Sequence, residues 1–325
     1  MILDSDVDIA LHDPSHGADP PATIGDPGRA YAEVRPLLRT DPSQPPDTAV
    51  DHGTVRDLEV RAASVRGLSH RQNGIPRQDA YGFAVTAAQD WLVAVVADGV
   101  SAGSLSHEAA SFVTRRGPRE VARRLDEGTA ANSLPWHEIF TGLAATILAE
   151  GTRSLRRNNA ERYADAAPTE TDVAAAMATT ATFLVCETGY QRHGLRHVYV
   201  AWIGDSPAWA IAPDGAWTSL SAIKGEGEEV GSSRVVALPK VPRDPAGLPY
   251  LEHTLDHRST LLLMTDGTGD PIAEARGEVA ARLAEWWRRP PAALVFADQV
   301  GFGRRSYDDD RTVVAIWPAS PPEPR

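Results

Sequence analysis

Short apolar runs alternate with long amphipathic stretches over most of the chain. Several runs are rich in Val, Ile, Leu or aromatic residues, which is typical of β-strands. These are Ala80–Thr86, Trp91–Ala97, Thr180–Val185, His197–Ile203, Thr260–Met264 and Thr312–Trp317. The spacing of apolar residues predicts helices over Ser106–Leu125, Ser133–Arg157 and Gly277–Arg289. We expect Gly117-Pro118 to break or kink the first of these helices.

The predicted strands come first in pairs, then two helices follow, and then strands again. Because strands and helices do not alternate regularly, a parallel doubly wound sheet is not expected, and an α+β layered sandwich is. Residues 1–55 are rich in Pro, Asp, Gly and Ala, without a sustained apolar period. Such a segment cannot bury enough surface to offset chain entropy. We therefore expect a disordered leader over residues 1–55, a folded domain over 56–318 and a short tail over 319–325.

Composition narrows the function classes. Hydrophobic residues make up 42% of the 325, which suffices for a core, and the net charge of −12 argues against a nucleic-acid-binding face. An arginine-rich stretch near Arg119 is interpreted as a solvated helix face. The single cysteine, Cys186, allows neither an intrachain disulfide nor a Cys/His zinc site. No apolar stretch reaches the about 20 residues that span a bilayer, and the N-terminus lacks a secretion signal, so we expect a cytoplasmic protein without a membrane segment.

Acidic residues stand at the ends of the predicted strands. Asp98, Asp205 and Asp266 each follow an apolar run, in Ala97-Asp98-Gly99, Ile203-Gly204-Asp205 and Thr265-Asp266-Gly267. Asp308-Asp309-Asp310 instead precedes the run Thr312–Trp317. If the last strand is antiparallel to its partners, the acids meet at one edge of the sheets. Like charges raise one another's pKa there, and hard divalent cations such as Mg²⁺ or Mn²⁺ would compensate. A single Asp-Gly could simply mark a turn, but the ordered set favours a metal site.

The ordered motifs resemble the metal-dependent (type 2C) serine/threonine protein phosphatase family, in its bacterial form. They are Gly67-Leu68-Ser69-His70, Pro76-Arg77-Gln78-Asp79-Ala80, Ala97-Asp98-Gly99-Val100 with Glu108-Ala109-Ala110, Thr179-Thr180-Ala181-Thr182, Gly204-Asp205-Ser206, Thr265-Asp266-Gly267 and Asp309-Asp310-Arg311-Thr312. The resemblance covers about residues 60–317. It implies a four-layer α-β-β-α sandwich, in which two largely antiparallel sheets are flanked by helix pairs.

The resemblance also implies a site that holds two divalent cations, Mn²⁺ or Mg²⁺, with a possible third. Asp98 would bridge the two core ions, Gly99 would offer its backbone carbonyl, and Asp266 and Asp309 would complete the set. Asp79 would act beside them, together with Gln78, and Asp205 matches the position for a weaker third ion. The implied reaction is hydrolysis of phosphoserine or phosphothreonine by a water between the two ions, without a covalent nucleophile. Thr180 is expected to be structural.

The chain departs from the family pattern at three places. Val100 stands where many members have a histidine, and Asp310 stands where asparagine usually follows the last metal acid. The arginine that grips phosphate in the commoner opening motif is absent, so His70, Arg71 or Arg77 would substitute, and His70 is preferred. Gly215–Pro249 corresponds to a flap that influences substrate choice in the family.

The expected partner is a phosphorylated protein, in opposition to a serine/threonine kinase, and the expected state is a monomer. Two alternatives stay open. One is a catalytically weak or inactive phosphatase-fold module that binds phosphoproteins as a regulator. The other is a metallohydrolase of a small phosphorylated metabolite.

Overall fold

The computed structural model describes residues 22–27, 44–189, 194–221, 236–272, 275 and 277–319. Among these residues, the strands form two antiparallel sheets. The six-stranded sheet has the order β1-β2-β11-β10-β7-β8 and the five-stranded sheet the order β3-β4-β5-β6-β9. The bounds of the strands are β1 Thr48–Val55, β2 Leu58–Val65, β3 Ala80–Val85, β4 Trp91–Ala97, β5 Ala181–Glu187, β6 Leu195–Ile203, β7 Ala208–Ile211, β8 Trp217–Ser219, β9 Tyr250–Asp256, β10 Thr260–Met264 and β11 Arg311–Pro318.

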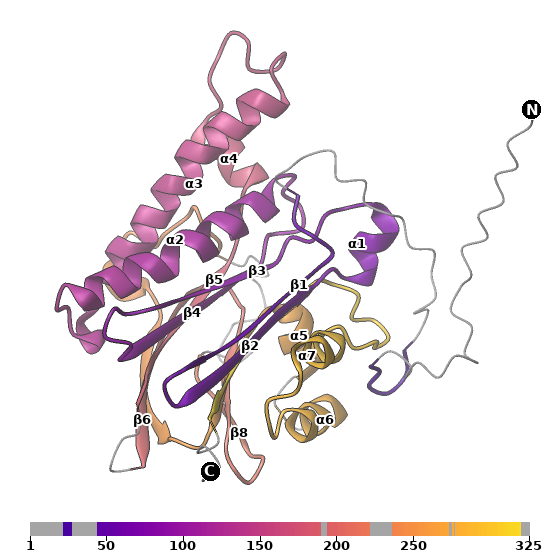
Figure 1. Cartoon of the computed structure of the whole chain (residues 1–325). Coiled ribbons are helices and arrows are strands. Elements are labelled where there is room, and N and C mark those ends of the chain that lie inside the picture. The colour runs from indigo at the N-terminus through magenta and orange to yellow at the C-terminus, as the bar shows by residue number, and fades with distance from the viewer. Residues whose placement is uncertain are drawn as a thin grey trace, which may run out of the picture.

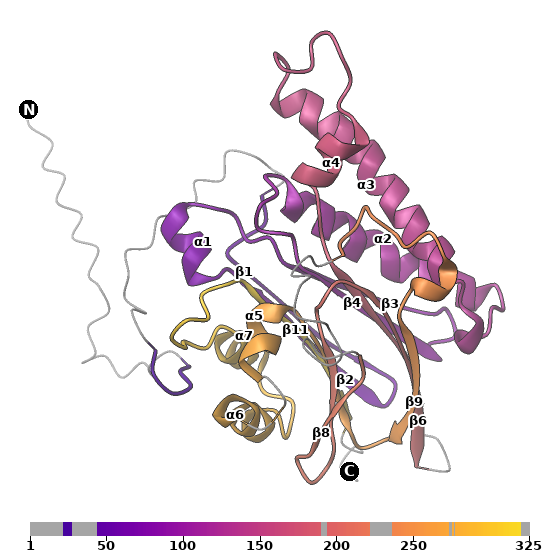
Figure 2. The same cartoon turned by 180° about the vertical axis from the view of Figure 1, so that it is seen from behind.

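The helices lie on the outer faces of the two sheets. Their bounds are α1 Leu68–Asn73, α2 Ser106–Asp126, α3 Trp136–Asn158, α4 Glu170–Ala176, α5 Asp266–Ile272, α6 Glu278–Trp286 and α7 Ala293–Val300, with short 3-10 turns at Ala131–Ser133 and Pro245–Gly247. Figures 1 and 2 show α2 and α3 together on one side of the strands, and α5, α6 and α7 on the other. The chain therefore has the expected four-layer α-β-β-α arrangement.

The alternation of side chains along β4 explains why the layers hold together. Val93, Val95 and Ala97 belong to the apolar cluster that packs the five-stranded sheet against α2 and α3. Leu92 and its alternate neighbours belong to the cluster between the two sheets. Successive side chains of a strand point to opposite faces, so a strand between two layers must be apolar throughout. A further cluster packs the six-stranded sheet against α6 and α7.

The expected leader is wrong in part. Thr48–Val55 forms β1 and pairs along its full length with β2, and Ile24 is buried in the cluster beneath α6 and α7. Backbone hydrogen bonds join Ile24 N to Gly303 O (3.1 Å) and Gly303 N to Ala22 O (2.8 Å). These segments carry few apolar residues of their own, and they are ordered because an existing sheet and core supply their partners. The remaining boundaries of the leader and tail stay predictions.

Gly117-Pro118 does not break the helix, because α2 continues past Pro118 to Asp126. A kink at this point stays a prediction. Proline removes one helical hydrogen bond and leaves the carbonyl four residues earlier, that of Thr114, without its usual donor. Thr114 O lies against β3 at Gly82, where an added Cβ would come within 2.0 Å of that oxygen. Gly82 therefore gives room to the carbonyl that Pro118 releases, and packing against β3 keeps the helix continuous.

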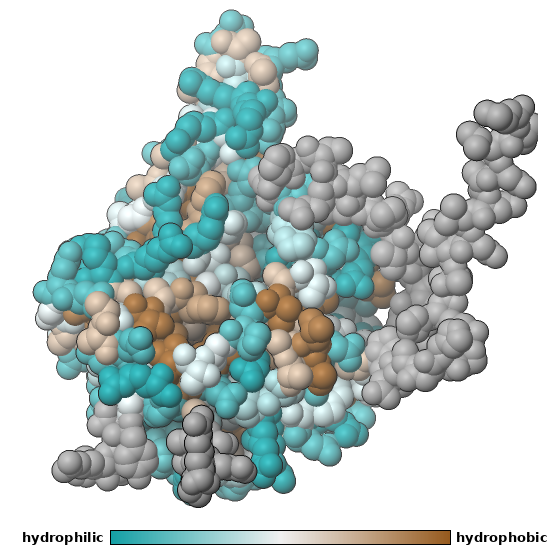
Figure 3. Space-filling view, in the orientation of Figure 1, coloured by the Kyte–Doolittle hydropathy of each residue, from teal (hydrophilic) through white to brown (hydrophobic). Residues whose placement is uncertain are grey.

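The arginine-rich face of α2 is paired with glutamates. Arg123 contacts Glu120 (2.8 Å), and Arg124 contacts both Glu120 (2.8 Å) and Glu138 (3.1 Å). Figure 3 shows hydrophilic residues over much of the visible surface around α2 and α3. Exposed pairs of this kind belong to a solvated helix surface and add little stability. In the described part of the chain, no helix is both long and apolar enough to cross a membrane.

Candidate metal centre

Strand directions bring the acidic residues to one end of the two sheets. β4 and β6 both run antiparallel to β5, so their carboxyl ends, followed by Asp98 and Asp205, lie at the same edge. β11 runs antiparallel to β10, which places the start of β11, preceded by Asp309, beside the end of β10, followed by Asp266. The antiparallel direction that the sequence argument required for the last strand is confirmed.

Hydrogen bonds from a neighbouring segment fix the backbone of Asp98. Its N–H donates to Thr180 Oγ1 (3.0 Å), and its carbonyl accepts from Thr180 N (2.8 Å) and Thr179 Oγ1 (2.9 Å). Gly99 faces Thr179 in an isolated antiparallel bridge whose hydrogen bonds are made by the flanking residues. In such a pair the carbonyl of Gly99 points away from its partner, as a metal-ligating carbonyl must. Thr180 thus supports the backbone of Asp98.

Asp79 is buried at the junction of the two sheets. Its Oδ2 accepts a hydrogen bond from Thr265 Oγ1 (2.6 Å), and Thr265 immediately precedes Asp266. Thr265 also holds the start of β11, because its Oγ1 accepts from Thr312 N (3.0 Å) and its N–H donates to Thr312 O (3.0 Å). One threonine thus connects acids from three distant parts of the chain. In the sequence, Thr265 stands out only as part of the motif Thr265-Asp266-Gly267.

Two glycines enclose the Asp308–Asp310 turn. An added Cβ at Gly67 would lie 2.2 Å from the carbonyl carbon of Asp309, and one at Gly267 would lie 2.0 Å from Asp310 O. Arg311, which is buried and stacks over the Phe302 ring, donates through Nε to Gly267 O (2.9 Å). The turn is therefore held on both sides by close backbone contacts that tolerate no side chain.

Crowding and partial burial raise the pKa values of the clustered carboxyls, of which Asp79 is buried and Asp98 and Asp266 are half-buried. Burial, followed by the charges of Asp79 and Asp266, raises the pKa of Asp98 well above its ordinary value. Burial raises the pKa of Asp266 to about 6, with Asp205 and Asp309 adding to the effect. Burial also raises the pKa of Asp79, well above its ordinary value, and that of Asp309. Acids that influence one another in this way lie close together, although their positions in the chain are far apart.

The donor set fits hard divalent cations. Carboxylate oxygens and a backbone carbonyl are the ligands that Mg²⁺ and Mn²⁺ prefer. Bound cations would also offset the repulsion and desolvation that raise the pKa values of Asp79, Asp98, Asp266 and Asp309. A second set of possible donors consists of His70, Asp309 and Asp310, which bring one ligand atom each within 4.8 Å of one another.

The three residues considered for gripping phosphate have different surroundings. His70 is 5% exposed, and its Nδ1 lies 2.9 Å from Asp310 Oδ1. Arg77 is also buried, and its guanidinium donates to Pro46 O (3.0 Å) and Asp79 O (2.9 Å). Arg71 lines a cavity of about 270 Å³ together with Asp309. Of the expected flap, residues 222–235 lie outside the described residues.

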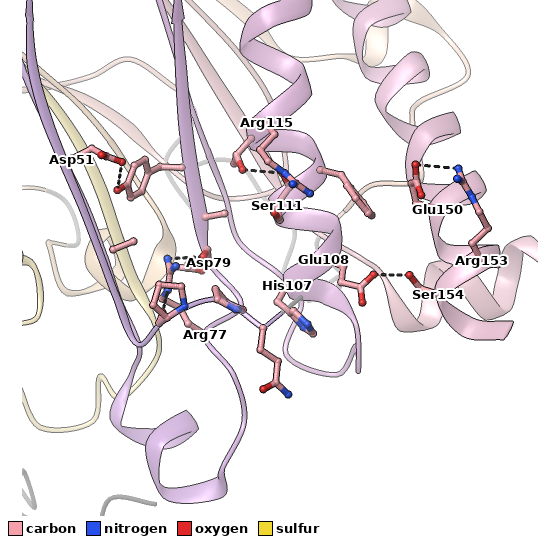
Figure 4. Close-up of a pocket in the computed structure, with 18 of the residues that line it drawn as sticks. Asp51, Arg77, Asp79, His107, Glu108, Ser111, Arg115, Glu150, Arg153 and Ser154 are labelled. Carbon is pink, nitrogen blue, oxygen red and sulfur yellow. Dashed lines mark hydrogen bonds and ion pairs between the residues drawn. The ribbon is translucent and has the colours of Figure 1, made fainter. Parts of the chain in front are cut away.

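A larger cavity, of about 680 Å³, lies between β1, β3, α2 and the end of α3 (Figure 4). Asp79 contributes to its lining, so it adjoins the acidic cluster. Its polar side chains pair with one another: Ser154 Oγ donates to Glu108 Oε2 (2.6 Å), and Arg153 contacts Glu150 (3.0 Å). Since acids and arginines balance one another there, the lining does not single out a class of ligand.

One solved structure with a TM-score above 0.5 has the same fold, and two further phosphatases are similar to this chain. A mutant of a bacterial serine phosphatase is 14% identical with a TM-score of 0.51, and the match covers 80% of this chain and 98% of that one. The S. agalactiae serine/threonine phosphatase is 14% identical, with a TM-score of 0.49 and coverage of 80% of this chain and 99% of that one. The catalytic domain of PstP, solved with two manganese ions, is 17% identical, with a TM-score of 0.48 and coverage of 81% and 99%.

A search of curated proteins found no match to this chain. The family model for protein phosphatase 2C, in contrast, matches residues 66–294. The matched range contains the opening motif with His70 and Asp79, as well as Asp98, Asp205 and Asp266. It ends before Asp309 and β11, which the sheet order places between β2 and β10. With most of its length matched by this model, the chain belongs to the protein phosphatase 2C family.

Proposed function

We propose that this protein hydrolyses phosphoserine and phosphothreonine on protein substrates with the help of two divalent cations, Mn²⁺ or Mg²⁺. The observation that carries the proposal is the convergence of Asp79, Asp98, Asp266 and Asp309 at one sheet edge with raised pKa values. Crowded acids that repel one another weaken a fold unless they serve a ligand, and cations are the ligand that this donor set suits.

The proposed roles of the residues are those that the family resemblance implies, and the contacts around Asp98 support them. The core ions would be held by Asp98, the Gly99 carbonyl, Asp266 and Asp309. Hydrogen bonds from Thr179 and Thr180 hold the backbone of Asp98 in place. Asp79 would support the core ions from beside them, and Asp205 would serve a weaker third ion. When bound, such ions neutralise phosphoryl charge and lower the pKa of water to near neutrality.

Phosphate recognition is assigned to Arg71 rather than to His70. Arg71 shares a cavity with Asp309, whereas His70 is buried and lies against Asp310. A guanidinium offers several donors in a planar fork that suits phosphate oxygens. His70 was the residue preferred from the sequence, and its burial favours a supporting place instead.

The test is release of phosphate from a phosphothreonine peptide by the full chain, with and without Mn²⁺. We expect turnover that depends on the added metal and is lost in Asp98→Ala. The exposed Asp165 provides a matched control, since Asp165→Ala also removes one carboxylate, and it should retain full activity. Turnover that persists after complete chelation, or in Asp98→Ala, would refute the proposal.

A second candidate function is a catalytically weak module that binds phosphoproteins. One observation that favours it is Val100, which stands where many family members have a histidine. Another is that Arg77 and His70 make contacts within the protein, so that only Arg71 remains as a candidate for phosphate recognition. Binding of a phosphopeptide to the metal-loaded chain without turnover would support it. A panel of small phosphorylated metabolites tests the third possibility. We still expect the protein to be a cytoplasmic monomer that acts in opposition to a serine/threonine kinase.

A further inference from the structure

Asp310 is the most enclosed member of the acidic turn before β11. Its side chain is 2% exposed, although it immediately follows the proposed metal ligand Asp309. Asp310 Oδ1 accepts a hydrogen bond from Gly67 N (2.6 Å), and Oδ2 accepts one from Gln78 N (2.6 Å). The third contact is with His70, whose Nδ1 lies 2.9 Å from Oδ1. Both carboxylate oxygens are therefore used within the protein.

The groups that face Asp310 all come from the opening motif of the domain. Gly67 directly precedes α1, His70 lies within α1, and Gln78 directly precedes Asp79. One carboxylate near the end of the chain thus joins three points of a short segment more than 200 residues earlier. The two acids next to these contacts are Asp309, adjacent to Asp310, and Asp79, adjacent to Gln78.

We propose that Asp310, paired with His70, is a positioning residue that sets the places of Asp309 and Asp79 relative to each other in the metal centre. The inference rests on the proposed metal-dependent function. Asp310 would not touch the ions or the substrate. It would act through the backbone of the turn, as groups behind metal ligands do when they orient those ligands.

The contacts explain why this chain has a carboxylate where asparagine usually stands. All three groups that face Asp310 can donate a hydrogen bond to it, and two of them are backbone N–H groups that can only donate. Asparagine has the same shape but only one acceptor oxygen, so its amide nitrogen would face the N–H of Gly67 or of Gln78. A buried donor without an acceptor is costly, and the turn would have to shift.

The experiment compares Asp310→Asn with Asp308→Asn in the metal-free full chain. Both variants remove one negative charge from the same turn, but Asp308 is exposed, and only its backbone carbonyl is held, by Ser69 N (2.9 Å). Mn²⁺ affinity and stoichiometry are measured by the paramagnetic resonance signal of free Mn²⁺, below the unfolding temperature, with circular dichroism as the check of folding. We expect Mn²⁺ to bind about 10- to 100-fold more weakly to Asp310→Asn, with unchanged stoichiometry. For Asp308→Asn we expect a change within about threefold.

A pair of changes at His70 keeps the inference testable if Asp310→Asn does not fold. His70→Asn keeps a donor on a shorter side chain, whereas His70→Leu removes it. The leucine variant should bind Mn²⁺ more weakly than the asparagine variant. Both should bind as many ions as the unsubstituted chain. With saturating Mn²⁺, we expect the loss in kcat to exceed the change in KM, because the acids are displaced while the substrate contacts stay.

The outcomes separate this inference from the proposed function. Equal Mn²⁺ affinity in Asp310→Asn and Asp308→Asn would overturn the positioning role. Loss of one bound Mn²⁺ in both Asp310→Asn and His70→Leu would overturn it as well, because the two side chains would then be metal ligands. An unsubstituted chain that binds Mn²⁺ but releases no phosphate would refute the proposed hydrolysis, and the variants would still decide the positioning role. An unsubstituted chain that binds no Mn²⁺ overturns both.

Discussion

Replacing Asp266 with asparagine is expected to stabilise the metal-free protein at pH 8 while removing its response to Mn²⁺. Burial raises the pKa of Asp266 from the ordinary 3.8 to about 6 in the folded protein. Because the folded value is the higher one, bound protons favour the folded state below pH 3.8, and this contribution is lost as the pH rises through about 6. The difference corresponds to about 3 kcal/mol at neutral and higher pH.

Asparagine carries no charge at any of these pH values, so it avoids this cost. The gain in the free energy of unfolding should approach about 3 kcal/mol at pH 8 and should vanish near pH 4. For a domain of this size, the gain corresponds to a rise of about 6–10 °C in Tm. The same substitution removes a carboxylate that we assign to the core ions. Mn²⁺ at 100 times its Kd should stabilise the unsubstituted chain by about 3 kcal/mol and the variant much less.

The assay is thermal unfolding of both proteins after chelation, at pH 4, 6 and 8, with and without Mn²⁺. The exposed Asp165 supplies the control, and Asp165→Asn should change Tm little at any pH. A metal-free Asp266→Asn that is less stable than the unsubstituted chain at pH 8 would refute the argument that crowded acids weaken this fold. A gain in stability that is equal at pH 4 and pH 8 would show that ionisation of Asp266 is not its cause.

Three further substitutions test the supports of the site. Gly67→Ala should weaken Mn²⁺ binding and lower Tm, because its Cβ would meet the Asp309 backbone at 2.2 Å. The control is Gly142→Ala in α3, which has open space around it and should raise stability by about 0.5–1 kcal/mol. Equal effects of the two variants on Tm would contradict the close contact at Gly67. Thr180→Val removes the acceptor for Asp98 N and should lower the free energy of unfolding in denaturant by about 1–3 kcal/mol. It should also weaken Mn²⁺ binding, as measured by calorimetry, and unchanged affinity would argue against support from this side chain. Ile24→Ala should lower the free energy of unfolding in denaturant by about 2–5 kcal/mol if the segment before β1 belongs to the core. An unchanged free energy of unfolding would show that this segment does not contribute to the core.

Elements with their own apolar pattern were predictable from the sequence. β4 and β10 have the predicted bounds, and α2 and α3 differ from prediction by a few residues at their ends. Local composition suffices there, because a strand buried on both faces must be apolar throughout and a long helix needs an apolar stripe. The sequence analysis could only assume that the last strand is antiparallel to its partners, and the structure shows that β11 is antiparallel to β10.

Elements stabilised by their partners were missed. β1 reads TAVDHGTV and is largely exposed, so its sequence carries no apolar run, and its order comes from pairing with β2. β7 spans only Ala208–Ile211 and is held by pairing with β10 on one side and β8 on the other. The continuity of α2 through Pro118 likewise depends on Gly82, a residue of another element. Propensity describes a segment alone, whereas pairing energy depends on what lies beside it.

The sequence by itself determined which strand ends carry acids, and from this an oxygen-lined metal site could be expected. The family motif favoured Asp309 over Asp308 and Asp310, but the residues alone could not distinguish them, because three identical neighbours look alike in a sequence. Tertiary structure gives each of them different surroundings. The carbonyl of Asp308 accepts a hydrogen bond from Ser69 N in α1, and the side chain of Asp310 is enclosed by donors. Burial raises the pKa of Asp266, and the charge of Asp309 adds to this effect. The physical reason is that a carboxylate's role is set by the donors and charges around it, and those come from residues more than 200 positions away.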